Sequence, residues 1–200
     1  MTKSFSVYLD IVRFLAAILV LLHHSNIRLL TTETAPFSGY GNSAVIVFFI
    51  LSGYVIAYIT DIKENNFKDY SVSRLARIYS VALPVVLITP IVDFLGQDFN
   101  VAFYEGHETL DYFFIRLVSS LLFLNEIWFV SIMSFSNVPY WSLCYEVWYY
   151  VLFAFYMFFQ GKKRIIVISA LCLCLGPKIL LLFPIWLVGV YLYRSQHFKN

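Results

Sequence analysis

The stretch LDIVRFLAAILVLLHHS, residues 9–25, decides how this chain folds. It is apolar enough to enter a lipid bilayer, yet it contains Asp10, Arg13, His23 and His24. Ionisable side chains are costly in hydrocarbon, so their presence inside a span indicates a polar partner or a function. A cleaved signal peptide is disfavoured, because these polar residues interrupt the segment and equally apolar segments follow it.

The whole chain is as apolar as its first segment. Of its 200 residues, 60% are hydrophobic, 20% aromatic and only 13% charged, whereas about a quarter of the residues of a soluble domain are charged. A water-soluble chain of this length could not bury so much apolar surface in one core. The net charge of +2 comes from short basic clusters beside apolar runs, which argues against nucleic-acid binding. The cysteines lie inside apolar segments and predict neither a disulfide framework nor a metal site.

The apolar segments predict an all-α fold, a polytopic transmembrane helical bundle that forms one integral-membrane domain over residues 1–200. The segments lie at residues 7–30, 43–60, 79–96, 112–130, 139–160, 165–176 and 178–194. A span needs about 20 residues at a rise of about 1.5 Å per residue, and the first, second, third and fifth segments meet this length. The sixth is short, and Gly176-Pro177 predicts a tight helical hairpin between it and the seventh.

The loops between these segments predict an orientation by the positive-inside rule. The loop at 61–77 is rich in Lys and Arg and the cluster KKR occupies 162–164, so both are expected in the cytoplasm, together with the N-terminus. The loop at 97–111 has acidic residues and no Lys or Arg, which suits the outer side. If every segment crossed the membrane once, the fifth segment would run outward and the cluster at 162–164 would lie outside, which conflicts with its expected cytoplasmic location. We therefore expect 112–130, which Asn125 and Glu126 interrupt, to be re-entrant or to lie partly in the interface.

In the first segment, Asp10, Arg13 and His24 share one face of the predicted helix. The eleven residues from Arg13 to His24 make three turns plus about 20°, Asp10 lies within about 40° of His24, and His23 points about 100° away. Histidine is the side chain best suited to proton transfer near neutral pH, so His24 is the candidate catalytic base. The alternative is an Asp10–Arg13 ion pair near the interface, with both histidines capping the outer end of the helix.

Two other pairs have both a functional and a structural interpretation. Ser52 and Gly53 lie in the middle of the second segment, where small side chains let another helix approach closely. Arg74 and Arg77, three residues apart at the cytoplasmic side, could bind phosphates in a bidentate manner. Ordinary helix packing for the first pair and positive-inside anchoring for the second are the alternatives.

The fifth segment begins NVPYWSLCYEVWYY, residues 137–150, and places Glu146 inside an apolar run. Ser142 lies one turn before this carboxylate, and Tyr149 and Tyr150 lie about one turn after it. A carboxylate that orients an imidazole and holds its tautomer forms a general-base arrangement. Glu146 and His24 are therefore a candidate pair, although the sequence does not tell whether they touch.

Four motifs occur in order and near the spacing expected of one family: LDIVRFLAAILVLLHH, VFFILSGYVI, RLARIY and WSLCYEVWYY. Together they resemble the membrane-bound acyltransferase-3 family, bacterial O-acyltransferases that acetylate surface polysaccharides and other glycans. The resemblance covers residues 5 to about 155. Each motif alone is degenerate, but four in order, including the eleven-residue spacing from Arg13 to His24, make a fairly specific match.

The resemblance implies roles at the matching positions. Arg13 and His24 match the essential pair in the family's first helix, and Arg74 and Arg77 match its RxxR motif, which is implicated in handling the acyl-CoA donor. The family's WSLxxE signature is matched by Trp141, Ser142, Leu143 and Glu146. Ser80 stands where the family commonly has Pro. Family domains usually have about ten spans, so this chain is expected to be an N-terminal portion, a truncated product or a shortened member.

The implied function is O-acyl transfer in the bacterial inner membrane, with acetyl-CoA or another acyl-CoA as co-substrate and no bound cofactor or metal. The acceptor would be a hydroxyl of a cell-envelope or exported carbohydrate, and a homo-oligomer is compatible with the resemblance. His24 would act as general base or acyl carrier, with Glu146, Arg13 and Asp10 in support. Two other interpretations stay open, a transporter or permease fragment with an intramembrane polar relay and a catalytically inactive truncated member.

Overall fold

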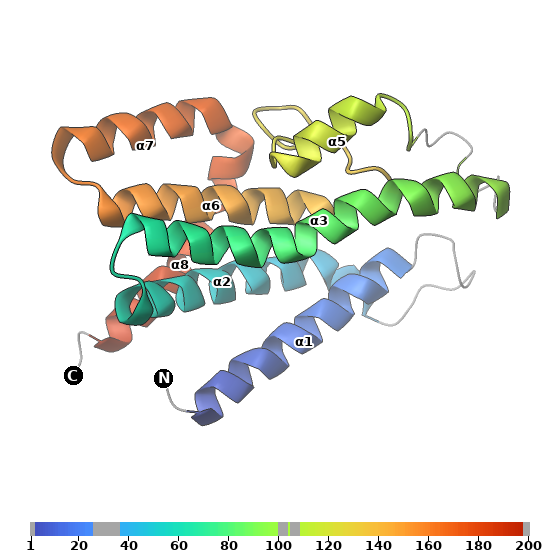
Figure 1. Ribbon diagram of the computed structural model, residues 1–200. Helices are drawn as coiled ribbons and strands as arrows, with labels where there is room; N and C mark the ends of the chain where they lie inside the picture. The colour runs from blue at the N-terminus through green and yellow to red at the C-terminus, as the bar shows by residue number, and fades with distance from the viewer. Residues whose placement is uncertain (1–2, 26–36, 100–103, 105–108, 198–200) are drawn as a thin grey trace. The chain divides into compact units, whose positions relative to one another are not determined.

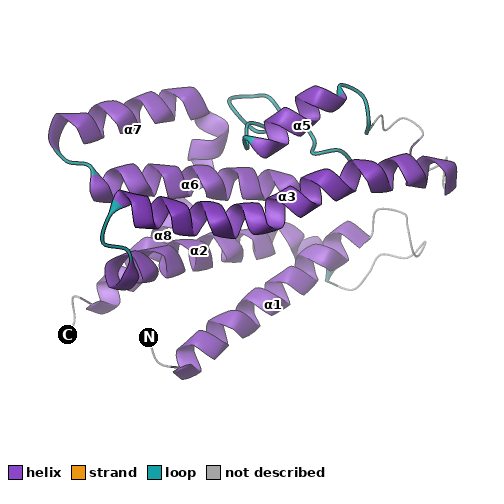
Figure 2. Cartoon of the chain, viewed as in Figure 1, coloured by secondary structure: helices purple, strands orange, loops and turns teal. Residues whose placement is uncertain are grey.

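The computed structural model describes residues 3–25, 37–99, 104 and 109–197 (Figure 1). Within these residues the chain is helical and contains no β-strand, as Figure 2 shows. The helices are α1 (Lys3–Ser25), α2 (Gly41–Lys63), α3 (Phe67–Phe99), α5 (Phe113–Leu121), α6 (Tyr140–Phe158), α7 (Gly161–Leu175) and α8 (Pro177–His197), with a 3-10 turn, η1, at Ser38–Tyr40. The predicted all-α class is confirmed.

Four of the described helices, α1, α2, α3 and α8, are long and apolar enough to cross a membrane. The predicted polytopic membrane class is therefore confirmed. Helix α6 has 19 residues, or about 28 Å of helix, which is close to the thickness of the hydrocarbon core. It is not among the four because many of its side chains are Tyr and Trp, whose polar atoms lower its mean hydropathy.

The predicted loop at 61–77 is wrong, because helix occupies most of it. Helix α2 continues to Lys63 and α3 begins at Phe67, so only residues 64–66 connect them. Asn66 caps α3: its side-chain oxygen accepts the Asp69 backbone N–H (2.9 Å), and its amide donates to the Asp69 carboxylate (2.7 Å). The first bond is an N-cap, which favours a helix start here, and the second joins the two side chains. The RLARIY motif consequently lies inside α3 rather than before it.

Segment 112–130 is not one continuous span, as the charge pattern predicts. Helix α5 is nine residues long, and the chain then turns, with positive φ angles at Phe123, Trp128 and Phe135. Asn125 holds this irregular stretch together, because its backbone carbonyl accepts the Ile132 N–H (2.9 Å) and its side chain donates to the Ile132 carbonyl (2.8 Å). Irregular backbone at membrane depth requires that its N–H and C=O groups find hydrogen-bond partners within the protein. The depth of this segment in a membrane stays a prediction.

The described residues form two compact units, which we treat separately. Unit 1 contains the described residues of 1–58 and 184–200, and unit 2 contains those of 59–183. In unit 2, α3 and α6 run antiparallel. At one end Phe67 contacts Phe155 and Phe159, with ring centroids 5.5 Å apart in both pairs. At the other end the Ser136 backbone N–H, just before α6, donates to Asp93 of α3 (2.9 Å).

In unit 1, α2 packs closely against α8 through small residues. A side chain at Gly53 would collide with the Trp186 carbonyl oxygen, and one at Gly189 would collide with the backbone of Ile50. Trp186 Nε1 donates to Ser52 Oγ (3.2 Å). Ser52 and Gly53 therefore serve the contact between these two helices.

We expect Gly53→Val and Gly189→Val to destabilise the protein strongly, because the atoms they meet are backbone and cannot move aside. Overpacking costs typically about 1–3 kcal/mol, and displaced helix backbones belong at the upper end. The measurement is the temperature at which a detergent-solubilised fluorescent fusion loses its monodisperse peak on size-exclusion chromatography. Gly39→Ala is the control, since nothing lies within 4 Å of the added carbon. Wild-type thermal stability of Gly53→Val would contradict this packing.

Candidate active site

The ring of His24, the candidate base, is held by its own helix. His24 Nδ1 lies 2.8 Å from the Val20 carbonyl oxygen, and the side chain is half-buried. A carbonyl can only accept a hydrogen bond, so Nδ1 carries the proton and the neutral ring has its lone pair on Nε2. This tautomer and orientation make Nε2 the basic atom.

His23 has a different environment from its neighbour. Its Nδ1 lies 2.7 Å from the Ser38 carbonyl oxygen, and a side chain at Gly41 would collide with its ring. His23 thus links α1 to the start of η1 and α2, and its ring meets that of His24 edge-on at 5.0 Å between centroids. His23 points about 100° away from the face that Asp10, Arg13 and His24 share, and its bond to the Ser38 carbonyl is a structural one.

Asp10 and Arg13 form an ion pair near the N-terminal end of α1. The distance from Arg13 Nη1 to Asp10 Oδ1 is 3.7 Å, and the Asp10 side chain is 68% exposed. Such an exposed pair contributes little to stability. Arg13 lies about 16 Å along the helix axis from His24, so a shared function would need a substrate long enough to reach both.

Arg74 is buried in unit 2 against Glu64, an acidic residue that the motif spacing does not indicate. Its Nη2 pairs with the Glu64 carboxylate, and both side chains are 5% exposed. Thr60 donates to the same carboxylate (3.2 Å), and the Tyr70 ring lies 5.5 Å from the guanidinium carbon. Arg74 Nε and Nη1 are also buried and have no hydrogen-bond partner. Two unsatisfied buried donors indicate a missing acceptor.

Arg77 lies on an exposed part of α3, whereas Arg74 is buried. The two residues of the RxxR motif therefore differ in environment although they are three residues apart. The buried guanidinium, rather than a two-arginine surface clamp, is the unusual feature of this motif. Glu64 could not be recognised from the sequence, because it reaches Arg74 only through the tight connection at 64–66.

Glu146 is half-buried on α6 and accepts a hydrogen bond from the Tyr150 hydroxyl one turn later. Two of its predicted neighbours form hydrogen bonds to backbone carbonyls: Tyr149 donates to the Ile179 carbonyl (2.8 Å) and Ser142 to the Pro139 carbonyl (3.0 Å). Tyr150 is the third predicted neighbour of Glu146, and its spacing of four residues places it on the same helix face.

His24 and Arg13 belong to unit 1, and Glu146 and Arg74 belong to unit 2. The predicted pairing of Glu146 with His24 therefore stays a prediction.

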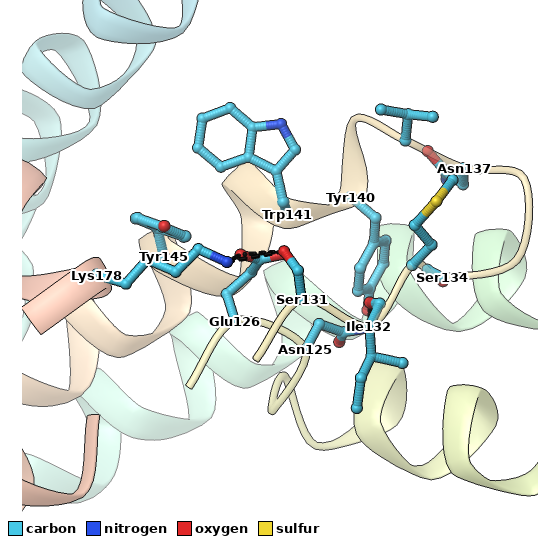
Figure 3. A pocket seen from close by; sticks show the side chains of 12 residues that line it. Asn125, Glu126, Ser131, Ile132, Ser134, Asn137, Tyr140, Trp141, Tyr145 and Lys178 are labelled. Carbon is cyan, nitrogen blue, oxygen red and sulfur yellow. Dashed lines mark hydrogen bonds and ion pairs between the residues drawn. The ribbon is translucent and has the colours of Figure 1, made fainter. Parts of the chain in front are cut away.

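Unit 2 also contains a pocket of about 290 Å³ beside the start of α6 (Figure 3). Its polar centre is Glu126, 6% exposed, whose carboxylate pairs with Lys178 and accepts the Ser131 hydroxyl (2.9 Å). Trp141 and Ser134 also line it. In the sequence, Asn125 and Glu126 pointed to this region, because they are polar residues inside an apolar segment. Lys178 and Ser134 gave no such signal, because their proximity depends on the tertiary fold.

Comparison with curated proteins gives two relatives of part of the chain. An O-acetyl transferase of Shigella phage Sf6 is 30% identical over 122 residues, which are 58% of this chain and 34% of that protein. An uncharacterized protein of Haemophilus influenzae is 28% identical over 125 residues, which are 58% of this chain and 49% of that protein. The matched region thus spans between a third and a half of the length of these relatives. No solved structure matches the chain significantly.

A family model described as an acyltransferase domain matches residues 6–198. This match includes the first-helix pair Arg13 and His24, the RxxR motif and the segment that contains Glu146. It extends beyond the four motifs to helices α7 and α8. The chain therefore belongs to the acyltransferase-3 family.

Proposed function

We propose that this protein is an integral-membrane O-acyltransferase. It transfers an acyl group, of which acetyl is the expected one, from an acyl-CoA donor to a hydroxyl of a cell-envelope or exported carbohydrate. Family membership and the similarity to a phage O-acetyl transferase support the reaction class. The observation that carries the proposal is His24, whose Nδ1 is fixed on the Val20 carbonyl, which leaves Nε2 as a base inside a membrane helix.

In the proposed reaction, His24 Nε2 accepts the proton of the acceptor hydroxyl while the hydroxyl oxygen attacks the thioester carbonyl. The resulting oxyanion collapses and expels the CoA thiolate, which takes the proton back from the imidazolium. The products are an ester and free CoA. The alternative is attack by Nε2 itself on the thioester carbonyl, which breaks the C–S bond, expels the CoA thiolate and gives a transient acyl-imidazole. The acceptor hydroxyl then attacks the acyl carbon, the C–N bond breaks to release the imidazole, and the hydroxyl proton passes to the CoA thiolate. Arg13 is the candidate to stabilise the oxyanion or the donor.

The donor side of the proposal rests on Arg74. A phosphate of acyl-CoA would supply acceptors for Nε and Nη1, which have no partner, while Glu64 holds Nη2 and fixes the plane of the guanidinium. Arginine suits this task because it stays charged and donates charge-assisted hydrogen bonds to phosphate oxygens from each of its nitrogens. Arg77, exposed one turn later, adds positive charge near the entry.

The arrangement of unit 2 supports a cytoplasmic donor side. The basic cluster at 162–164 follows the end of α6, and that end contacts the start of α3 through Phe67. Lys63 and Lys68 flank this start. Basic residues gathered at one end of a bundle favour the cytoplasmic side of the membrane, so we propose an inner-membrane location with the N-terminus in the cytoplasm.

The first test measures ester-linked acyl groups on envelope glycans by mass spectrometry in cells that express the chain or its variants. His24→Ala is expected to lower the ester content about 100-fold or more, because general-base help is worth about 10² to 10⁴ in rate. The control is His23→Gln, whose side-chain amide can still donate to the Ser38 carbonyl, and it should stay within about threefold of wild type. Membrane insertion is checked with a fluorescent fusion. Wild-type ester levels in His24→Ala would refute the mechanism.

A second test separates the structural and functional roles of Arg74. Arg74→Met alone leaves Glu64 buried and unpaired, which costs about 3–5 kcal/mol, so it should lower the detergent melting temperature sharply. The double variant Arg74→Met/Glu64→Leu removes both charges and should recover most of that stability. It should still fail to release CoA from acetyl-CoA in membranes that supply acceptor. A stable double variant with wild-type CoA release would exclude Arg74 as a donor-binding residue.

A further inference from the structure

The pocket beside the start of α6 has no role in the mechanism above. Its volume of about 290 Å³ lies near the lower end of the roughly 300–1,000 Å³ typical of small-molecule sites. Ser131, Met133 and Val138 line it and are exposed, so the pocket reaches the surface of unit 2. The loop 122–139 and the first turns of α6 form most of its wall.

One hydroxyl in the pocket wall has no partner. Ser134 is 2% exposed, and its Oγ forms no hydrogen bond. A buried hydroxyl without a partner costs about 1–3 kcal/mol, so its retention in a pocket wall indicates a ligand that supplies the missing bond. Thr109 has a similarly buried and unpartnered hydroxyl but does not line the pocket.

The charged pair in the pocket is neutral as a whole. Lys178 extends from α8 to Glu126 and also donates to Ser131 Oγ (2.7 Å) and to the Val130 carbonyl (3.1 Å), as Figure 3 shows for the first two partners. A carboxylate has about four acceptor sites, so Glu126 can still accept a ligand hydroxyl. A phosphate or carboxylate ligand would meet the negative charge of Glu126 beside the single cation of Lys178. The pocket therefore suits a neutral ligand with hydroxyl groups.

Trp141 adds an aromatic surface to this polar site. It lies at the first turn of α6, is half-buried, and meets the Tyr145 ring edge-on at 5.2 Å between centroids. An indole face packs well against an apolar surface while polar groups around it form hydrogen bonds. A pyranose ring has this dual character, because its C–H bonds form apolar faces and its hydroxyls lie around the edge.

The pocket walls are held in place before any ligand arrives. Asn125, 1% exposed, donates to the Ile132 carbonyl (2.8 Å) and to Ser120 Oγ (3.2 Å). Asp93 of α3 accepts the Ser136 backbone N–H (2.9 Å), which anchors the chain beside Ser134. Preorganised walls reduce the ordering cost of binding.

We propose that this pocket binds a neutral, hydroxyl-bearing sugar residue of the acceptor carbohydrate. Ser134 and Glu126 form hydrogen bonds to its hydroxyls, and Trp141 stacks on its apolar face. The sugar's role as acyl acceptor rests on the proposed function, whereas sugar binding itself does not. The pocket lies near the Asp93 end of α3, opposite the basic end, and therefore on the outer side if the basic end is cytoplasmic.

The test is saturation-transfer NMR on the full chain in detergent micelles. The probes are methyl glycosides of glucose, galactose, rhamnose and N-acetylglucosamine, together with alkali-de-esterified oligosaccharides from the envelope of the expressing cells. Wild type should transfer saturation to ring protons of at least one probe. Ser134→Ala should weaken that binding about three- to tenfold, the value of one neutral hydrogen bond, and Glu126→Gln should weaken it about tenfold or more. Thr109→Val is the matched control and should bind as wild type.

The outcomes separate this proposal from the proposed function. His24→Ala should bind the sugar probes as wild type does, because His24 does not line the pocket. Sugar binding by wild type without any ester formation would leave the pocket in place and refute only the transferase. Ester formation with unchanged acceptor dependence in Ser134→Ala and Glu126→Gln would overturn the pocket and leave the transferase. Absence of saturation transfer to every probe would also overturn it. A loss of sugar binding in Thr109→Val equal to that in the pocket variants would overturn it as well. A raised requirement for acetyl-CoA in the pocket variants, without weaker sugar binding, would have the same consequence.

Discussion

The need to satisfy ionisable side chains away from water governs the described part of unit 2. A buried charge is tolerated only when it is paired or hydrogen-bonded. In unit 2, Arg74 is paired with Glu64 and Glu126 with Lys178, while the buried Asp93 accepts a backbone N–H. Each of these contacts joins segments that local helix formation would not bring together. The same side chains that make the sequence unusual for a membrane protein therefore determine how its segments are connected.

Most of the fold could be predicted from apolar segments and charge, and the one clear error has a physical cause. Lys and Arg between 61 and 77 indicated a loop, because charged residues usually end a span. A helix, however, can continue beyond the bilayer at no cost in hydrogen bonds. Helix α3 is 33 residues long, more than a span needs, and Asn66 caps its start. At 112–130, in contrast, the prediction from charge and polarity was correct. The polar pair Asn125-Glu126 and the charge conflict correctly indicated that no continuous span forms there.

The candidate site could be predicted only where its residues share one helix. Spacing along α1 distinguished His24 from His23, and the structure gives the two rings different carbonyl partners. Contacts between segments could not be found in this way. Glu64 meets Arg74 after a three-residue connection, and Lys178 meets Ser131 across 47 positions. Helical periodicity carries no information on such pairs, because they depend on how helices pack and not on the angle between residues along one axis.

The ion pairs Arg74–Glu64 and Lys178–Glu126 of unit 2 differ in which hydrogen-bonding groups they leave unsatisfied, and this difference bears on substrate selection. At the basic end, the Nε and Nη1 atoms of Arg74 are buried without a partner, so the site lacks acceptors and suits an anionic group. At the Asp93 end, Lys178 is already bonded to a carboxylate, a hydroxyl and a carbonyl, and what remains is acceptor capacity on Glu126 and one hydroxyl on Ser134. A phosphate is favoured at the first site and disfavoured at the second. The proposed anionic donor and neutral acceptor would therefore be sorted to opposite ends of unit 2 by local charge balance alone.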